Sequence, residues 1–169
     1  RLLNVKKPVI AWIEGAITGA GISLALSCDF QIISETSKCA FSFVNIGFVP
    51  DSGAACLVTR AVGTTRAKDL FMSGRFFSGK DAADWGLFTE AVPAEELEER
   101  VMKYVKKYSS GPSVAYAGIK TVINRAQFAA YADAMQAEID AQGECELTED
   151  FPEAVTAFLE KRRPQFKGK

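Results

Sequence analysis

The run of residues between positions 9 and 34 constrains the fold more than any other part of the sequence. Residues 9–13 are rich in β-branched and aromatic side chains, as expected for a buried strand that ends at a glycine. Small and aliphatic residues then continue through positions 20–28, a stretch too long for such a strand, which predicts a buried helix. Residues 30–34 are again apolar and predict a second short strand. Strand, glycine turn, helix and strand in this order predict a parallel α/β unit.

Turn residues divide the rest of the chain into shorter elements. Residues 40–44 predict another strand, and Gly and Pro then mark a shaped loop over residues 46–53. After Pro93 the sequence becomes charged, alanine-rich and amphipathic, which predicts a helical second half. The expected helices span residues 54–61, 66–72, 78–85, 95–108, 114–125, 130–142 and 152–161. The aromatic residues expected in the core are Phe71, Phe76, Phe77, Trp85 and Phe88.

Length and composition limit the class of protein. The chain has 169 residues, of which 48% are apolar, and this suffices for one buried core. Its formal charge of −1 gives no basic field for nucleic acid, and no apolar run approaches the ~20 residues that cross a bilayer. The first residues lack the pattern of a signal peptide, so we expect a cytoplasmic protein without nucleic-acid or membrane partners. Because the chain lacks an initial Met and runs almost directly into a strand, we also expect it to be truncated.

The absence of histidine narrows the possible chemistry. It excludes a Ser-His-Asp triad, a Cys-His pair and histidine-based metal sites. The cysteines Cys28, Cys39, Cys56 and Cys145 lie far apart without a C-x-x-C pair, which predicts reduced core thiols and no metal site. Acid-base chemistry therefore falls to Asp, Glu, Tyr, Lys or Cys.

Small residues mark the start of the first predicted helix. Gly19, Ala20 and Gly21 stand where backbone N–H groups lack an acceptor within the helix and where the helix dipole is positive. Such N–H groups can stabilise an oxyanion, for instance the enolate of a thioester. Small residues at a strand-helix turn are also common for close packing alone. The residues themselves leave both interpretations open.

Residues 7–21, followed by Ala-Leu-Ser-Cys-Asp-Phe at residues 25–30, resemble the signature of the crotonase (enoyl-CoA hydratase/isomerase) superfamily. Similar segments continue in family order to the closing residues 157–166, so the resemblance covers essentially the whole chain. It implies an α/β fold, with the C-terminal part of a crotonase-like ββα superhelix over residues 1–92. Residues 93–169 would form a helical trimerisation region, and the N-terminal part of the family fold would be missing.

The resemblance also implies a site and a reaction. It places one N–H donor to the thioester oxygen at Ala20 and the other upstream of residue 1. The two glutamates of family hydratases fall on Ser23 and Phe43, neither of which can act as a carboxylate base. Asp51, in Val-Pro-Asp-Ser-Gly, is similar to the acid of the 1,2-epoxyphenylacetyl-CoA isomerase-like and enoyl-CoA isomerase branch, so a double-bond isomerase with Asp51 as proton shuttle is predicted. The predicted substrate-binding residues are Gly19, Gly21, Phe43, Phe48 and Pro50.

Simpler interpretations exist for parts of this site. Asp51 or Ser52 can instead cap the next helix, which is typical of Asp in a Pro-Asp-Ser-Gly context. Phe158 and Lys161 fit the solvated end of an amphipathic helix. The resemblance implies instead that both reach the CoA of a neighbouring subunit in a homotrimer or a dimer of trimers.

Two alternatives to the isomerase remain. One is enoyl-CoA hydration or another crotonase reaction, because this scaffold supports several. The other is a non-catalytic module for acyl-CoA binding or oligomerisation. In each case the expected ligand is an acyl-CoA thioester, and no further cofactor is implied.

Overall fold

A computed structural model describes residues 2–128 and 130–168 of the protein. Its first sheet contains three parallel strands in the order β1-β3-β6, formed by β1 (Ile10–Ile13), β3 (Phe30–Ser34) and β6 (Glu90–Val92). The two strands predicted over residues 9–34 and their parallel pairing are confirmed. The strand β6 was not predicted, because three residues between turns give too short a pattern to distinguish.

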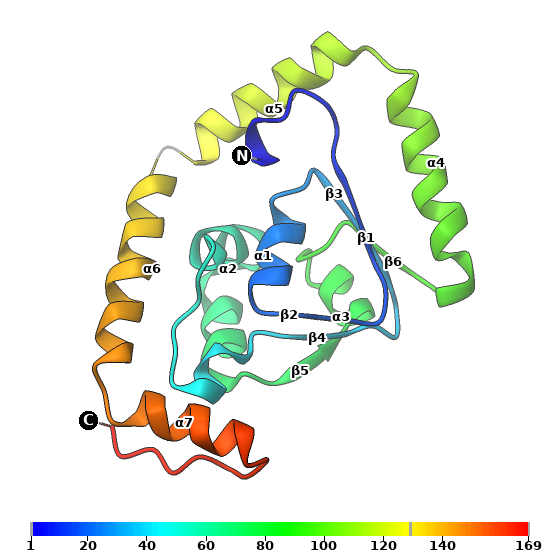
Figure 1. The fold of residues 1–169 in the computed structure, drawn as a ribbon. Helices are drawn as coiled ribbons and strands as arrows, with labels where there is room; N and C mark the ends of the chain where they lie inside the picture. Colours follow the sequence, from blue (N-terminus) through cyan, green and yellow to red (C-terminus); the bar gives the residue numbers. More distant parts are fainter. Residues whose placement is uncertain (1, 129, 169) are drawn as a thin grey trace.

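A second three-stranded sheet has the order β2-β4-β5. In it β2 (Ala16–Thr18) pairs parallel with β4 (Lys38–Ala40), and β4 pairs antiparallel with β5 (Phe76–Ser78). The chain therefore passes from the first sheet to the second twice, through β1 and β2 and then through β3 and β4 (Figure 1).

The strand predicted over residues 40–44 is wrong in its position. Pairing with the short neighbours β2 and β5 ends at Ala40, opposite Thr18 and Phe76. After that residue the chain turns into a 3-10 helix, η2 (Ser42–Ile46). The pairing partners, which are distant in sequence, decide where this strand ends.

Three α-helices belong to the described α/β part. The helix α1 (Ala20–Leu26) follows β2, and α2 (Ala54–Ser73) is broken at Gly63, whose φ of 78° and ψ of 162° are not helical. This break confirms the two helices predicted on either side of Gly63. The helix α3 (Gly79–Asp84) begins with a capping box, in which Ser78 and Asp81 each bind the other's backbone N–H.

The main hydrophobic core lies among the two sheets and helices α1 to α3. Phe41 is fully buried in it and packs edge-on against Phe71, with 4.8 Å between ring centroids. Burial of one such side chain contributes roughly 1.5–3 kcal/mol. On β5, Phe77 is buried as predicted, but Phe76 is exposed, because adjacent residues of a strand point to opposite faces of the sheet.

Four α-helices follow β6 among the described residues and surround the α/β part as an arc (Figure 1). They are α4 (Leu97–Ser109), α5 (Ser113–Gln127), α6 (Tyr131–Glu146) and α7 (Asp150–Leu159). A small apolar cluster joins α4 to the first sheet, while α6 contacts α2 and α7 contacts η2. The predicted helical second half is thus confirmed.

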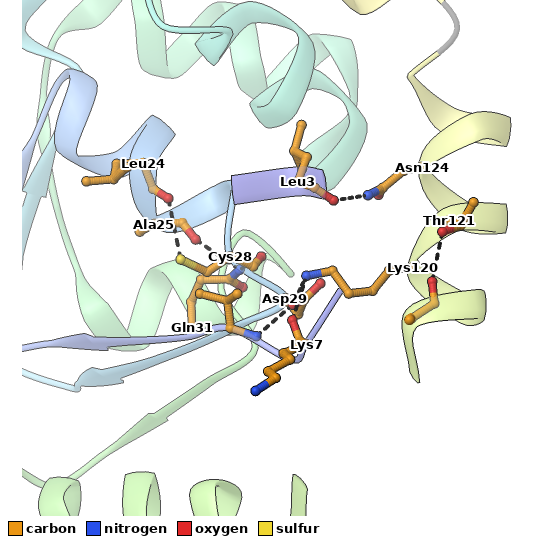
Figure 2. A network of polar contacts seen from close by, with 12 residues as sticks. Leu3, Lys7, Leu24, Ala25, Cys28, Asp29, Gln31, Lys120, Thr121 and Asn124 are labelled. Atoms are coloured by element: carbon orange, nitrogen blue, oxygen red, sulfur yellow. Dashed lines mark hydrogen bonds and ion pairs between the residues drawn. The ribbon is translucent and has the colours of Figure 1, made fainter. Parts of the chain in front are cut away.

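A polar network ties α5 to the first sheet (Figure 2). The Asp29 carboxylate accepts hydrogen bonds from Val9 N–H at 2.7 Å and from Lys120 Nζ at 2.6 Å. Lys120 Nζ also donates to the carbonyl oxygen of Lys7, and Asn124 donates to that of Leu3. The Lys120 side chain is only 11% exposed, so it holds two separate segments together in a poorly solvated position.

Replacing Lys120 by Met is expected to lower the free energy of unfolding. Met keeps the apolar stem but leaves the Asp29 carboxylate without its cation. We expect a loss of about 2 kcal/mol, less than for a fully buried pair, because Asp29 keeps its bond from Val9. The matched control is Lys103→Met, which breaks an exposed ion pair with Glu99 and should leave stability unchanged. Urea unfolding of both variants measures the difference, and equal midpoints would contradict the prediction.

Candidate active site

The predicted oxyanion turn lies where β2 passes into α1. Gly19 has a φ of 51°, which side-chain-bearing residues rarely adopt, and its N–H donates to the carbonyl oxygen of Ala40 at 3.0 Å. Ala20 is the first residue of α1 and is exposed, so its N–H belongs to the helix-terminal donors that lack an acceptor within the helix. A Cβ on Gly21 would lie 3.3 Å from Ile17 Cγ1. Close packing and helix-terminal donors therefore occur in the same turn.

Phe43 lies against this turn. A Cβ on Gly19 would be 3.4 Å from Phe43 Cζ, so the glycine and the ring are in contact distance. The carbonyl oxygen of Phe43 in turn accepts a hydrogen bond from Phe48 N–H at 3.0 Å. The structure thus brings together three residues that sequence analysis assigned to substrate binding.

The backbone of Asp51 is hydrogen-bonded to helix α1. The Ser23 hydroxyl, fully buried in α1, donates to the Asp51 carbonyl oxygen at 3.4 Å. The Asp51 side chain is half-buried, and its Oδ1 atom is buried without a hydrogen-bond partner among the described residues. A buried acceptor without a partner is rare in folded proteins and can indicate a functional role.

The alternative in which Asp51 or Ser52 caps the next helix is wrong. The N-cap of α2 is Gly53, and neither the Asp51 nor the Ser52 side chain forms a capping hydrogen bond. Instead the Glu138 carboxylate, from α6, accepts hydrogen bonds from Gly53 and Ala55 N–H. Ser52 and Gly53 both have positive φ, so the chain turns before α2 begins.

The loop between η2 and α2 is held by the C-terminal helices. The Phe48 ring packs against that of Phe151 in α7, with centroids 4.8 Å apart. Gln142 in α6 donates to the carbonyl oxygen of Val49 at 3.3 Å. Pro50 is half-buried in this loop, directly before Asp51. Helices that are distant in sequence therefore hold the loop that carries the predicted acid.

Phe158 lies near the C-terminal end of α7, and Lys161 follows just after that helix. Phe158 is 74% exposed on α7 and lines a groove of about 470 Å³ with residues of η2 and the C-terminal segment. Lys161 is exposed, has a φ of 55°, and donates its N–H to the Phe158 carbonyl oxygen. The described contacts of this pair are separate from those of Asp51.

Other groups that can carry chemistry do not form a competing site. Burial raises the pKa of the Cys39 thiol to about 12 and also raises the pKa of Cys28 and Cys56, so none of the three is an activated nucleophile. Within residues 2–128 and 130–168, no cluster of Cys, Asp and Glu side chains can hold a metal ion. In that same part of the chain, no helix is both long and apolar enough to cross a membrane.

A large groove at the N-terminal segment does not include Asp51, Phe43 or Gly19. This groove of about 620 Å³ lies between the N-terminal segment and α5, and it includes Lys6 and Lys120. Its lining reaches Tyr131, whose ring lies against Gly53, but it does not include Asp51 itself. The assignment of the site therefore rests on the contacts of Asp51, Phe43 and Gly19 and not on cavity size.

The two linked sheets, the glycine turn before α1 and the helical arc define a crotonase fold. The profile of the enoyl-CoA hydratase/isomerase family matches residues 1–169, and the chain belongs to this family. It is similar to an enoyl-CoA hydratase of known structure from Mycobacterium avium subsp. paratuberculosis, with a TM-score of 0.94 and 37% identity. That match covers 98% of this chain and 68% of the other.

Two similar proteins are isomerases by name. The trans-2-decenoyl-[acyl-carrier-protein] isomerase of Streptococcus mutans is 34% identical, with 99% of this chain and 64% of that protein covered. The 1,2-epoxyphenylacetyl-CoA isomerase of Escherichia coli is also 34% identical, with 100% of this chain and 64% of that protein covered. The chain thus spans slightly less than two thirds of the length of these relatives.

Proposed function

We propose that the full protein containing this chain is an acyl-CoA double-bond isomerase. The observation that carries the proposal is the buried Oδ1 atom of Asp51, which has no hydrogen-bond partner in the described structure. A carboxylate oxygen that is not used for capping or ion pairing is available as a base. Ser23 and Phe43 supply no second carboxylate at the positions of the hydratase glutamates, and one carboxylate suffices for isomerisation.

The proposed reaction needs one proton shuttle and one oxyanion site. Asp51 removes a proton from C2 of a 3-enoyl thioester, and the electron pair moves onto the thioester oxygen to give a dienolate. The N–H of Ala20 is one of the donors that hold this oxygen. The protonated Asp51 then returns the proton to C4, which gives the conjugated 2-enoyl thioester and restores the carboxylate. Atoms and electrons balance without an added oxidant, reductant or metal.

The remaining site residues are proposed on the same basis. Gly19, Gly21, Phe43, Phe48 and Pro50 would line the acyl thioester, which the contacts of Phe43 with Gly19 and Phe48 support. Phe158 and Lys161 would reach the CoA of a neighbouring subunit in a homotrimer or a dimer of trimers. A ring and an ammonium group suit an adenine and a phosphate, and both residues are exposed. We propose a cytoplasmic location for this enzyme.

A second candidate is hydration of a 2-enoyl-CoA. It is supported by the similarity to the solved enoyl-CoA hydratase, which exceeds that to either isomerase in identity. It requires a group that activates water, and the positions of both hydratase glutamates lack a carboxylate. We therefore favour isomerisation.

One optical assay separates the candidates. The full-length protein is mixed with a 3-enoyl-CoA, and the ultraviolet absorbance of the conjugated 2-enoyl thioester is followed. Isomerisation is expected to raise this absorbance, whereas hydration of added 2-enoyl-CoA would lower it. Absence of both changes with several chain lengths, together with measurable acyl-CoA binding, would favour the non-catalytic binding module.

A further inference from the structure

The candidate site contains a buried carboxylate that the proposed reaction does not use. Glu138 lies in the middle of α6 and is only 7% exposed. Its Oε2 accepts a hydrogen bond from Gly53 N–H at 2.7 Å, and its Oε1 accepts one from Ala55 N–H at 2.9 Å. A residue 85 positions away in sequence therefore binds the backbone just after Asp51.

The charge of Glu138 is balanced by backbone and not by a cation. Among the described residues, no Lys or Arg forms an ion pair with it. Glutamate is seldom buried unless it is paired, because removing the charge from water costs free energy. Here the two N–H groups and the positive end of the α2 dipole stabilise the carboxylate charge in place of a cation. Gly53 has no side chain that could cap the helix itself.

The backbone that Glu138 binds is unusual in conformation. We call residues 51–53 the Asp51 turn. Ser52 has a φ of 56° and Gly53 a φ of 79°, and Ser52 is one of only two non-glycine residues with positive φ in the described chain. Such a conformation costs of order 1 kcal/mol or more, and it persists when surrounding contacts determine it. Tyr131, also in α6, fills the space that a side chain at residue 53 would need.

The place of the Asp51 carboxylate depends on this turn. Its Oδ1 atom has no hydrogen bond of its own to hold it, so the backbone of the turn sets its position. Ser23 binds the turn through the Asp51 carbonyl oxygen, and Glu138 binds it through Gly53 N–H and binds the start of α2 through Ala55 N–H.

We infer that Glu138 is a positioning residue that holds the Asp51 turn in the conformation needed for proton transfer. The inference rests on the proposed function, because it gives Asp51 the role of base. It also gives the helical region a role in positioning the catalytic group, since the Glu138 carboxylate belongs to α6.

The test compares Glu138→Gln with Glu144→Gln in the full-length protein. Glu144 lies on the same helix and is exposed, so it is the matched control. Glutamine keeps the shape of Glu138 but removes the charge and presents an NH₂ group to one of the two N–H donors. Rates are expressed per acyl-CoA-binding site, titrated with a saturated acyl-CoA, so that unfolded protein does not count. Glu138→Asp, which keeps the charge but is too short to reach both N–H groups, is the second variant.

Both Glu138 variants are expected to lose about tenfold to a hundredfold in kcat with KM unchanged, since a displacement of about 1 Å at a reacting group costs up to about a hundredfold. Glu144→Gln should match the unaltered protein. Because Glu138 acts through Asp51, Glu138→Gln should cause no further loss in an Asp51→Asn background, whereas a merely structural role would slow both backgrounds equally.

The same rates distinguish failure of the positioning role from failure of the proposed function. If Asp51→Asn is slow but the Glu138 variants keep full kcat, or if the losses multiply in the double variant, the positioning role is overturned and the proposed function stands. If Asp51→Asn is as fast as the unaltered protein, the proposed function itself is overturned, and the role of Glu138 with it.

Discussion

Asp51→Asn is expected to lower kcat for the isomerisation of a 3-enoyl-CoA by about a thousandfold, which is within the range of a general base. The amide has nearly the shape of the carboxylate, so the packing around the half-buried side chain should be kept. It cannot accept a proton from C2 at neutral pH, and it has no proton to return to C4 in the way a carboxylic acid does. Acyl-CoA binding should therefore survive while turnover is lost.

The measurement is the rate of formation of the conjugated thioester at saturating substrate, together with the dissociation constant of a saturated acyl-CoA. Asp133→Asn, at an exposed position of α6, is the matched control and should behave as the unaltered protein. A variant that keeps most of its turnover would show that another group moves the proton, and the hydratase and other crotonase reactions would then have to be considered again.

Ala20→Pro is expected to lower kcat by about a hundredfold to a thousandfold, the usual cost of losing one oxyanion donor. Proline lacks the N–H that the proposed reaction uses, yet it is well tolerated at the first position of a helix, which Ala20 occupies. The preceding residue, Gly19, has a φ of 51° and a ψ of −125° and so lies outside the right-handed helical region that a following proline disfavours. The substitution thus removes a donor with little change to the fold.

Ala20→Ser serves as its control, because serine adds a small polar group at an exposed position but keeps the N–H. Its kcat should remain close to that of the unaltered protein. Circular dichroism and thermal unfolding of both variants check that α1 is intact. If the proline variant folds and still turns over at the normal rate, the thioester oxygen is not held by Ala20.

The order and type of the long elements follow from the sequence, because each is set by local pattern. The strand and helix periodicities over residues 9–34, the break at Gly63, the capping box at Ser78 and the four C-terminal helices all depend on residues within one element. The short strands β2, β5 and β6 and the true end of β4 depend on partners in other parts of the chain. Pairing between distant segments leaves too little local signal in three-residue strands.

The candidate site likewise contains residues that the local sequence predicts and one residue that only tertiary packing places. The motifs around Gly19 and Asp51 are contiguous in sequence, so the sequence alone determined the family and the predicted acid. Glu138 lies in a helix where nothing in the local pattern separates it from exposed glutamates such as Glu144. Only the packing of α6 against α2 buries it and brings its carboxylate to the free N–H groups after Asp51. A capping role for Asp51 was excluded for the same physical reason: another carboxylate, supplied by the tertiary structure, already occupies the helix end and leaves Oδ1 of Asp51 without a partner.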